Sequence, residues 1–381
     1  MSTYSNRGIS IIGSILKTLT PFEALKRFAK LSESLYPQPL TFNRTSWDPS
    51  PTVKLKLVPW YILSFLVDII ATSFYLVLLQ QLLSLKKDIN ISVALCLLLV
   101  LTCAVANIST AIFYTYHSRA DELCFVIRNL CRMRATLKET SSLTGIFLHG
   151  LISAIIITPL GACSTTIQDR TLDPTYLWFR NIPNISPRLQ LFFRILIVFS
   201  LELHASILIF GLGVIGVNIT VLILESLGTR RKRWNICKFV VRIQTYCQLQ
   251  IIIQVLNTIT SFFLPVFTLT VVVLAVVMGH MIIKMTGNIP HALVILEIIT
   301  TAVIVGFILI AYPIFADVLR KSTDFLRSLE LQGGSIYKRR QLRSCRPLKI
   351  RAGSYFYIHQ GTVIKLLELI AYYTMSSIIL V

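Results

Sequence analysis

Ionisable side chains inside long apolar runs are the residues of this sequence best placed to do chemistry. A charged side chain in hydrocarbon costs at least about 2.5–3.5 kcal/mol, so it usually faces a partner or a polar cavity. Glu297 would need either a structural hydrogen bond or water in a vestibule, and His204 would either bond to a neighbouring helix or contact a ligand. The full set is Asp68, Arg194, Glu202, His204, His280, Glu297, Lys365 and Glu368.

Catalytic, cofactor and metal signatures are absent from the sequence. The eight cysteines include no CxxC pair and lie mostly in or beside apolar runs, which argues against a disulfide framework or a metal site. Residues 211–216 match GxGxxG, but a dinucleotide site needs a preceding strand and an aqueous pocket, whereas small residues in an apolar run permit close helix packing. There is also no HExxH, P-loop or GxSxG motif. We therefore expect no enzyme, no cofactor and no bound metal.

The composition identifies the solvent around these residues. The chain has 381 residues, of which 54% are hydrophobic and only 14% charged, against roughly 25% charged in a soluble domain. The apolar residues form unbroken runs of about 20 residues, the length that crosses a bilayer as a helix. A soluble fold is excluded, and the predicted class is an all-α membrane protein.

Seven transmembrane helices are predicted. The fourth run is too long for one crossing but too short for two, so we expect one helix that projects from the membrane. Residues 251–264 are too short to cross alone and are interpreted as a lead-in to the fifth span, with a kink at Pro265. The predicted spans are 57–82, 92–116, 143–163, 189–227, 261–283, 291–312 and 357–380.

The basic residues predict the orientation of these spans. Alternate segments outside the spans hold 29 Lys and Arg on one side and 6 on the other. By the positive-inside rule the N-terminus is cytoplasmic and the C-terminus extracellular. The net charge of +20 is thus explained by topology and does not indicate nucleic-acid binding. The basic run 230–233 is interpreted first as a stop-transfer signal, and a contact to anionic lipid is the alternative.

Two cytoplasmic helices are predicted outside the spans. Thr20, Pro21 and Glu23 form an N-terminal capping signature that opens an amphipathic helix, with its apolar face on the membrane interface and its basic residues towards anionic lipid. Residues 317–331 have helical spacing and are followed by Gly333 and Gly334, which end the helix before a basic stretch.

The stretch from Arg346 to Phe356, RPLKIRAGSYF, resembles the basic-Pro-Leu-x-Ile-x-Ala-Gly-x-aromatic motif that precedes the last span of insect odorant receptors. A cytoplasmic N-terminus also suits the insect odorant and gustatory receptor superfamily and is the reverse of a G-protein-coupled receptor. The gustatory branch ends with Thr-Tyr, five apolar residues and Gln-Phe. Here Tyr372 and Tyr373 fall at that place and the Gln is missing, so the branch stays open.

The resemblance implies a chemosensory receptor that acts as a tetrameric, ligand-gated, non-selective cation channel in the plasma membrane of sensory neurons. Its ligand would be a small organic odorant or tastant, and the tetramer would be a homomer or include a co-receptor subunit. By resemblance, residues 1–56 are a cytoplasmic segment, 57–316 hold spans one to six with the ligand-binding bundle, 317–356 form a cytoplasmic anchor and 357–381 line the pore. The alternative is a seven-span receptor or transporter without its own pore. The repeated halves typical of transporters are not visible.

Within that frame, depth along the outer halves of spans two, three, four and six selects the ligand-contact candidates. They are Cys96, Val100, Ile157, Cys163, Phe193, Ser200, His204, Glu297 and Thr301. The pore candidates are Tyr373, Thr374, Ser376, Ser377, Ile379 and Leu380, with an apolar gate at Ile379 or Leu380. Thr374 and Ser377 share one face of the last span, while Ser376 and Ile379 share another. Alternatively, the serines only permit close helix packing.

Overall fold

The computed structural model describes residues 19–84, 88, 91–134, 143–168, 173–180, 185–228, 236–285, 287, 291–331 and 336–380. Within these residues, seven helices are long and apolar enough to cross a membrane, which confirms the predicted all-α membrane fold. They are α3 (Val58–Leu83), α4 (Val93–Arg134), α5 (Leu143–Gln168), α7 (Pro187–Gly228), α8 (Ile236–Met285), α9 (His291–Glu330) and α11 (Gln360–Leu380).

Several of these helices are longer than the membrane is thick. The fourth span is the single 42-residue helix α7, as predicted, and α8 has 50 residues and runs through Pro265. At 1.5 Å per residue they are about 63 and 75 Å long, roughly twice the thickness of the hydrocarbon core. The predicted helix 317–331 is the continuation of α9, and α4 continues past its predicted end after a kink at Arg119. The extra length therefore projects beyond the apolar spans.

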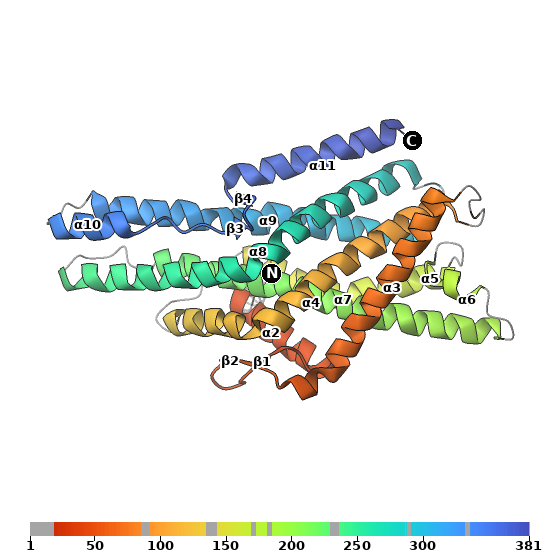
Figure 1. The fold of residues 1–381 in the computed structure, drawn as a ribbon, viewed down its shortest axis with the longest axis horizontal. Coiled ribbons are helices and arrows are strands. Elements are labelled where there is room, and N and C mark those ends of the chain that lie inside the picture. Colours follow the sequence, from red (N-terminus) through yellow and green to blue (C-terminus); the bar gives the residue numbers. More distant parts are fainter. Residues whose placement is uncertain are drawn as a thin grey trace, which may run out of the picture.

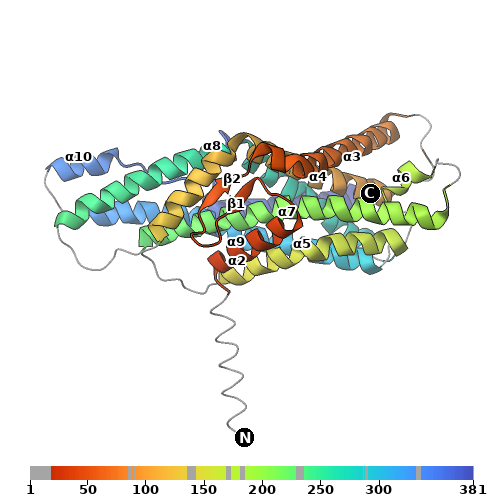
Figure 2. The same ribbon diagram turned by 90° about the horizontal axis from the view of Figure 1, so that it is seen from below.

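The projecting ends gather at one end of the bundle. Figures 1 and 2 show α10 (Ile336–Ser344) at one end of the bundle, where it contacts α9, while the short helix α6 (Tyr176–Phe179) and the C-terminus lie at the opposite end. In the interior, α5 packs along α7 and α4 packs along α8. Helix α11 lies at the margin of the bundle, against α8 and α9 (Figure 1).

The N-terminal helix α2 (Pro21–Leu35) packs on the bundle through its apolar face. Thr20 caps the helix as predicted, because its Oγ1 accepts a hydrogen bond from the Glu23 amide at 3.2 Å. Leu25 and Phe28 are buried, and α2 contacts α5 and α7. A Cβ atom added at Gly211 of α7 would lie only 2.3 Å from Phe28 Cζ, so the glycine leaves room for this ring. The prediction that lipid covers this apolar face is wrong, because protein covers it.

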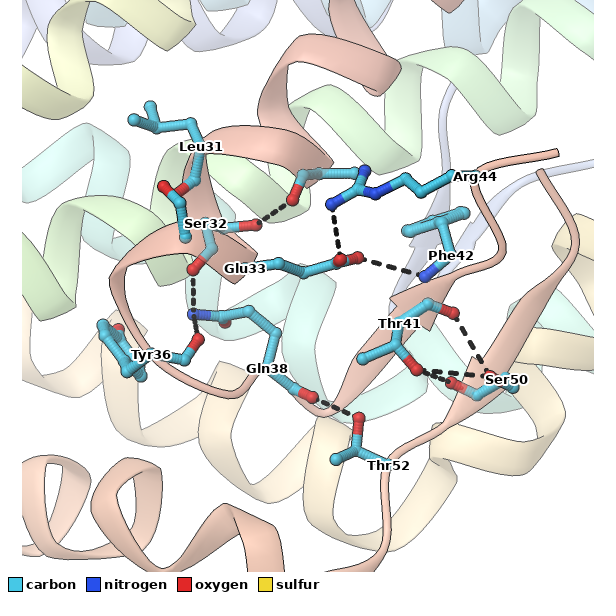
Figure 3. Close-up of polar contacts among 12 residues, drawn as sticks. Leu31, Ser32, Glu33, Tyr36, Gln38, Thr41, Phe42, Arg44, Ser50 and Thr52 are labelled. Atoms are coloured by element: carbon cyan, nitrogen blue, oxygen red, sulfur yellow. Dashed lines mark hydrogen bonds and ion pairs between the residues drawn. The ribbon is translucent and has the colours of Figure 1, made fainter.

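A polar hairpin follows α2 and closes this segment (Figure 3). Strands β1 (Leu40–Phe42) and β2 (Pro49–Pro51) pair antiparallel, and the short 3₁₀ helix η1 (Lys54–Leu57) leads into α3. The Glu33 carboxylate accepts from the Phe42 amide at 3.0 Å and pairs with Arg44 at 2.6 Å. Arg128 of α4 donates to the Pro49 carbonyl at 2.9 Å, which ties the hairpin to the bundle.

The motif before the last span is an extended segment laid along α8. Leu348, Ile350 and Ala352 alternate into the core, the period expected of extended chain, and the pair of strands β3 (Arg351–Ala352) and β4 (Phe356–Tyr357) follows. Gly353 turns between these strands with φ of +60°, and a Cβ there would lie 2.8 Å from the Ser261 carbonyl oxygen. The Leu-x-Ile-x-Ala-Gly pattern is thus a packing and turn requirement.

Hydrogen bonds hold the same segment in place. Asn257 of α8 donates to the Lys349 carbonyl at 2.8 Å and accepts from the Arg351 amide at 2.9 Å. Tyr246 donates its hydroxyl to the Arg346 carbonyl at 2.9 Å. These contacts join α8 to the chain that enters α11.

Candidate functional site

A cavity of about 190 Å³ lies between the helices at the α6 end of the bundle. Helices α3, α4, α5, α7, α8 and α9 and the segment before α6 all contribute to its wall, which includes Val67, Phe74, Leu101, Val198 and Met278. An apolar cavity on the order of 150 Å³ is known to bind benzene, so this one can hold a single ring with a small substituent. The resemblance implied a ligand site among spans two, three, four and six, and this cavity lies among those spans together with α3 and α8.

One of the acidic groups in the wall already has a basic partner. Asp173 is buried and forms an ion pair with Arg194 of α7, whose Nε donates to Asp173 Oδ2 at 2.7 Å and whose Nη2 contacts the same oxygen. The other carboxylate oxygen accepts from the amide and the hydroxyl of Thr175, at 2.8 and 2.7 Å. The ion pair fastens the segment before α6 to α7 and explains how Arg194 is accommodated at 1% exposure.

Two further carboxyl groups line the cavity, Glu202 of α7 and Glu297 of α9. Glu297 is 1% exposed, and neither of its carboxyl oxygens has a hydrogen-bond partner within the described part of the chain. Burial without a partner is expensive for a carboxyl group. Of the two alternatives for Glu297, a structural hydrogen bond is absent from the described part of the chain, and the residue lies at the wall of a cavity.

Threonine hydroxyls supply most of the other polar groups. Thr102, Thr158, Thr166 and Thr300 each donate to a carbonyl of the preceding turn of their own helix, at 2.8 to 3.1 Å. Since the only proton of each hydroxyl is already donated to a backbone carbonyl, the hydroxyl oxygen can offer a ligand only its acceptor lone pairs. The wall therefore offers acceptors for a ligand that donates hydrogen bonds.

Of the nine residues predicted to contact a ligand, Glu297 lines the cavity. The other eight are not part of the described lining: Cys96, Val100, Ile157, Cys163, Phe193, Ser200, His204 and Thr301. His204 forms hydrogen bonds with neighbouring elements of the chain, because Tyr36 Oη lies 2.7 Å from its Nδ1 and Ser64 Oγ lies 2.9 Å from its Nε2. Cys163 bonds across to the Ile195 carbonyl, and Thr301 contacts Met278, itself part of the wall.

The lining residues missed by sequence reasoning are mostly small or ordinary. Glu202 was marked by its charge but was not selected as a ligand contact, and Asp173 lies outside the predicted spans. Nothing in a single sequence distinguishes Thr102 or Thr158 from other threonines in apolar helices. A charge within a span was the one available signal, and it would have found Glu202.

The two faces of α11 have different surroundings. A Cβ at Gly279 of α8 would lie 3.0 Å from Thr374 Cγ2, and Ser377 Oγ lies 3.2 Å from His280 Nδ1. Thr374 and Ser377 therefore pack against α8 of the same chain. The side chains of Tyr373 and Ile379 are exposed and Ser376 is half-buried. The side chain of Leu380, the other gate candidate, lies outside the described residues.

The fold and the cavity define a polytopic membrane protein with an apolar cavity between its helices. The chain is similar to the solved structure of the insect olfactory receptor OR5 from Machilis hrabei, with a TM-score of 0.65 at 12% identity over 92% of this chain and 96% of that chain. It is also similar to the structure of that receptor in complex with eugenol, with a TM-score of 0.61 at the same identity and coverage. Comparisons by sequence with protein-family models and with curated proteins give no match.

The chain therefore has the fold of an insect olfactory receptor, which confirms at the level of fold the resemblance found in residues 346–356.

Proposed function

We propose that this protein is a chemosensory receptor that works as a ligand-gated, non-selective cation channel in the plasma membrane. The observation that carries the proposal is the olfactory-receptor fold over 92% of the chain. The receptor of similar fold that was solved with eugenol holds a small aromatic molecule, and the cavity described above has room for one ring. A small organic ligand in this cavity would contact six of the seven spans, so its binding can alter their packing.

The proposal favours the odorant branch. The stretch 346–356 retains the odorant-receptor pattern, and its Leu348, Ile350, Ala352 and Gly353 each have a defined structural role. The chain end lacks the Gln of the gustatory pattern. Expression in olfactory sensory neurons follows from this assignment.

The pore is proposed to form where four copies of α11 meet. In its most apolar 18 residues only 11% are buried within the chain, so most of α11 needs cover from outside. Because Thr374 and Ser377 face α8, the face with Ser376 and Ile379 is the one available to an ion path. An apolar ring at Ile379 would close this path by dewetting. The tetramer is a homomer or contains a co-receptor subunit.

The basic residues support the proposed orientation. Segment 1–56 and anchor 317–356 would lie in the cytoplasm, spans one to six within 57–316 would hold the ligand, and 357–381 would end outside. A tag before Thr20 should then be detected only after permeabilisation, and a tag after Val381 on intact cells. The reverse pattern would contradict this topology.

Reconstitution of the purified chain tests the function. The expected result is a tetramer by particle mass in nanodiscs and ligand-dependent single-channel openings in planar bilayers. A folded protein that binds small organic molecules as a monomer, without current alone or with a co-receptor, would instead support the alternative of a seven-span receptor or transporter without its own pore.

A further inference from the structure

We propose that the cavity is selective for a small organic cation, a primary amine on a single apolar ring or short chain, with Glu297 as the partner of its ammonium group. This inference rests on the proposed function, because it assumes that the ligand of the receptor binds in this cavity. The carboxyl group of Glu297 and its chemistry then specify the class of ligand.

The first observation is the state of Glu297. This side chain is 1% exposed at the wall of a cavity, and both carboxyl oxygens lack a hydrogen-bond partner among the described residues. By contrast, Asp173 in the same wall has every partner it needs in Arg194 and Thr175. A ligand that brings a positive charge and several N–H donors would satisfy Glu297 as Arg194 satisfies Asp173.

The second observation is the charge balance of the wall. The described lining contains three acidic residues, Asp173, Glu202 and Glu297, and no Lys, Arg or His. Arg194 compensates Asp173 alone, which leaves Glu202 and Glu297 to face the cavity from α7 and α9. An anionic ligand would meet repulsion, and a cation would meet attraction strengthened by the low dielectric of the site.

The third observation is the placement of hydroxyl acceptors and apolar surface. Thr300 lies three residues after Glu297, on the same face of α9, and donates to the Leu296 carbonyl at 2.8 Å, so its oxygen is free to accept. An ammonium group has three donors, enough for Glu297 and one hydroxyl together. An inorganic cation would need about six oxygen ligands, whereas most of this wall is aliphatic or aromatic and suits a hydrocarbon body.

A panel of ligands with one shape and different charge tests the proposal. Benzylamine, benzyl alcohol, toluene and benzoate share a ring and one substituent. Binding to the full-length protein in nanodiscs is measured by calorimetry, independently of any current. Benzylamine is expected to bind at least about tenfold more tightly than benzyl alcohol, and benzoate least, because a charge-assisted hydrogen bond is worth about a factor of ten or more. Equal affinity for benzylamine and benzyl alcohol would overturn the proposal without any variant.

The substitution Glu297→Gln then assigns the contact. It keeps the shape of the side chain and removes its charge, and it should lower benzylamine affinity about tenfold while changing benzyl alcohol affinity by less than about threefold. The matched control Glu330→Gln makes the same change at an exposed position of α9 and should alter neither. Should Glu297→Gln reduce the yield of folded protein, Glu202→Gln provides a second reading, with a smaller loss for benzylamine alone. Retained benzylamine affinity in both variants would overturn the proposal.

The experiments distinguish a failure of the amine site from a failure of the channel function. Selective benzylamine binding that depends on Glu297, without any current, would support the amine site and contradict the channel. Currents evoked by neutral odorants, with no preference for benzylamine in binding, would support the channel and contradict the amine site.

Discussion

Helices α7 and α11 are both apolar membrane helices, yet their surroundings are opposite. In the most apolar 18 residues of α7, 67% are buried within the chain, against 11% in α11. Polar groups on α7 meet partners from the same chain, as Arg194 does with Asp173 and His204 does with Tyr36 and Ser64. On α11, Tyr372, Tyr373 and Ile379 are exposed. Helix α7 is thus stabilised by its own chain, whereas α11 has a surface that lipid, water or further subunits must complete.

The largest effect on stability is expected at the buried ion pair between Arg194 of α7 and Asp173. Arg194→Leu would leave the Asp173 carboxylate buried without its charged partner, at a cost of about 3–5 kcal/mol. We expect a large fall in the thermal midpoint of detergent-solubilised protein, measured by fluorescence-detected size exclusion. The control Arg188→Leu changes an exposed residue in the first turn of the same helix and should have little effect. Equal falls for both variants would contradict the structural role of the ion pair.

An intermediate effect on stability is expected at the hydrogen bond between Tyr36 of the N-terminal segment and His204 of α7. Burial raises the pKa of Tyr36, so its hydroxyl keeps its proton at neutral pH and can donate to His204 Nδ1. Tyr36→Phe removes that partner from a buried ring and should cost about 1–3 kcal/mol. On α11, Tyr372 is 67% exposed, and Tyr372→Phe should stay within about 0.5 kcal/mol. If the thermal midpoints of the two variants are equal, the contrast between the helices does not extend to these residues.

The smallest effect on stability is expected at the end of α11. There the substitution should instead change the channel current. Ile379 and Leu82 of α3 are both 78% exposed, and Ser in place of either should change the free energy of unfolding by about 0.5 kcal/mol or less. Ile379→Ser should raise the ligand-free cation current, because a polar residue wets an apolar gate, and Leu82→Ser should not. Unchanged basal current in Ile379→Ser, in a channel that conducts, would show that this face of α11 lies away from the pore.

The sequence alone predicted the elements that depend on local physics. Unbroken apolar runs identified seven spans because a helix in lipid satisfies its own backbone hydrogen bonds. The fourth apolar run was too long for one crossing and too short for two, which identified α7 as one long helix. The capping residue Thr20 identified the start of α2. The cost of a charge in hydrocarbon singled out Glu297 and Arg194 before any neighbour was known. The covering of α2 by protein was missed, because an apolar helix face has the same pattern against lipid or against α7.

Only the tertiary structure decided which side of each helix meets the cavity. On α4 the cavity meets Thr102 and Val105, while Cys96 and Val100 had been selected, and on α5 it meets Thr158 in place of Ile157. Span position fixes depth along a helix, but rotation about its axis comes from packing against neighbours. These helices are apolar on all sides because both lipid and the protein interior are apolar, so no polar stripe marks either face. Glu297 was found because a carboxyl group is excluded from lipid, and the aliphatic and threonine positions around it carry no comparable signal.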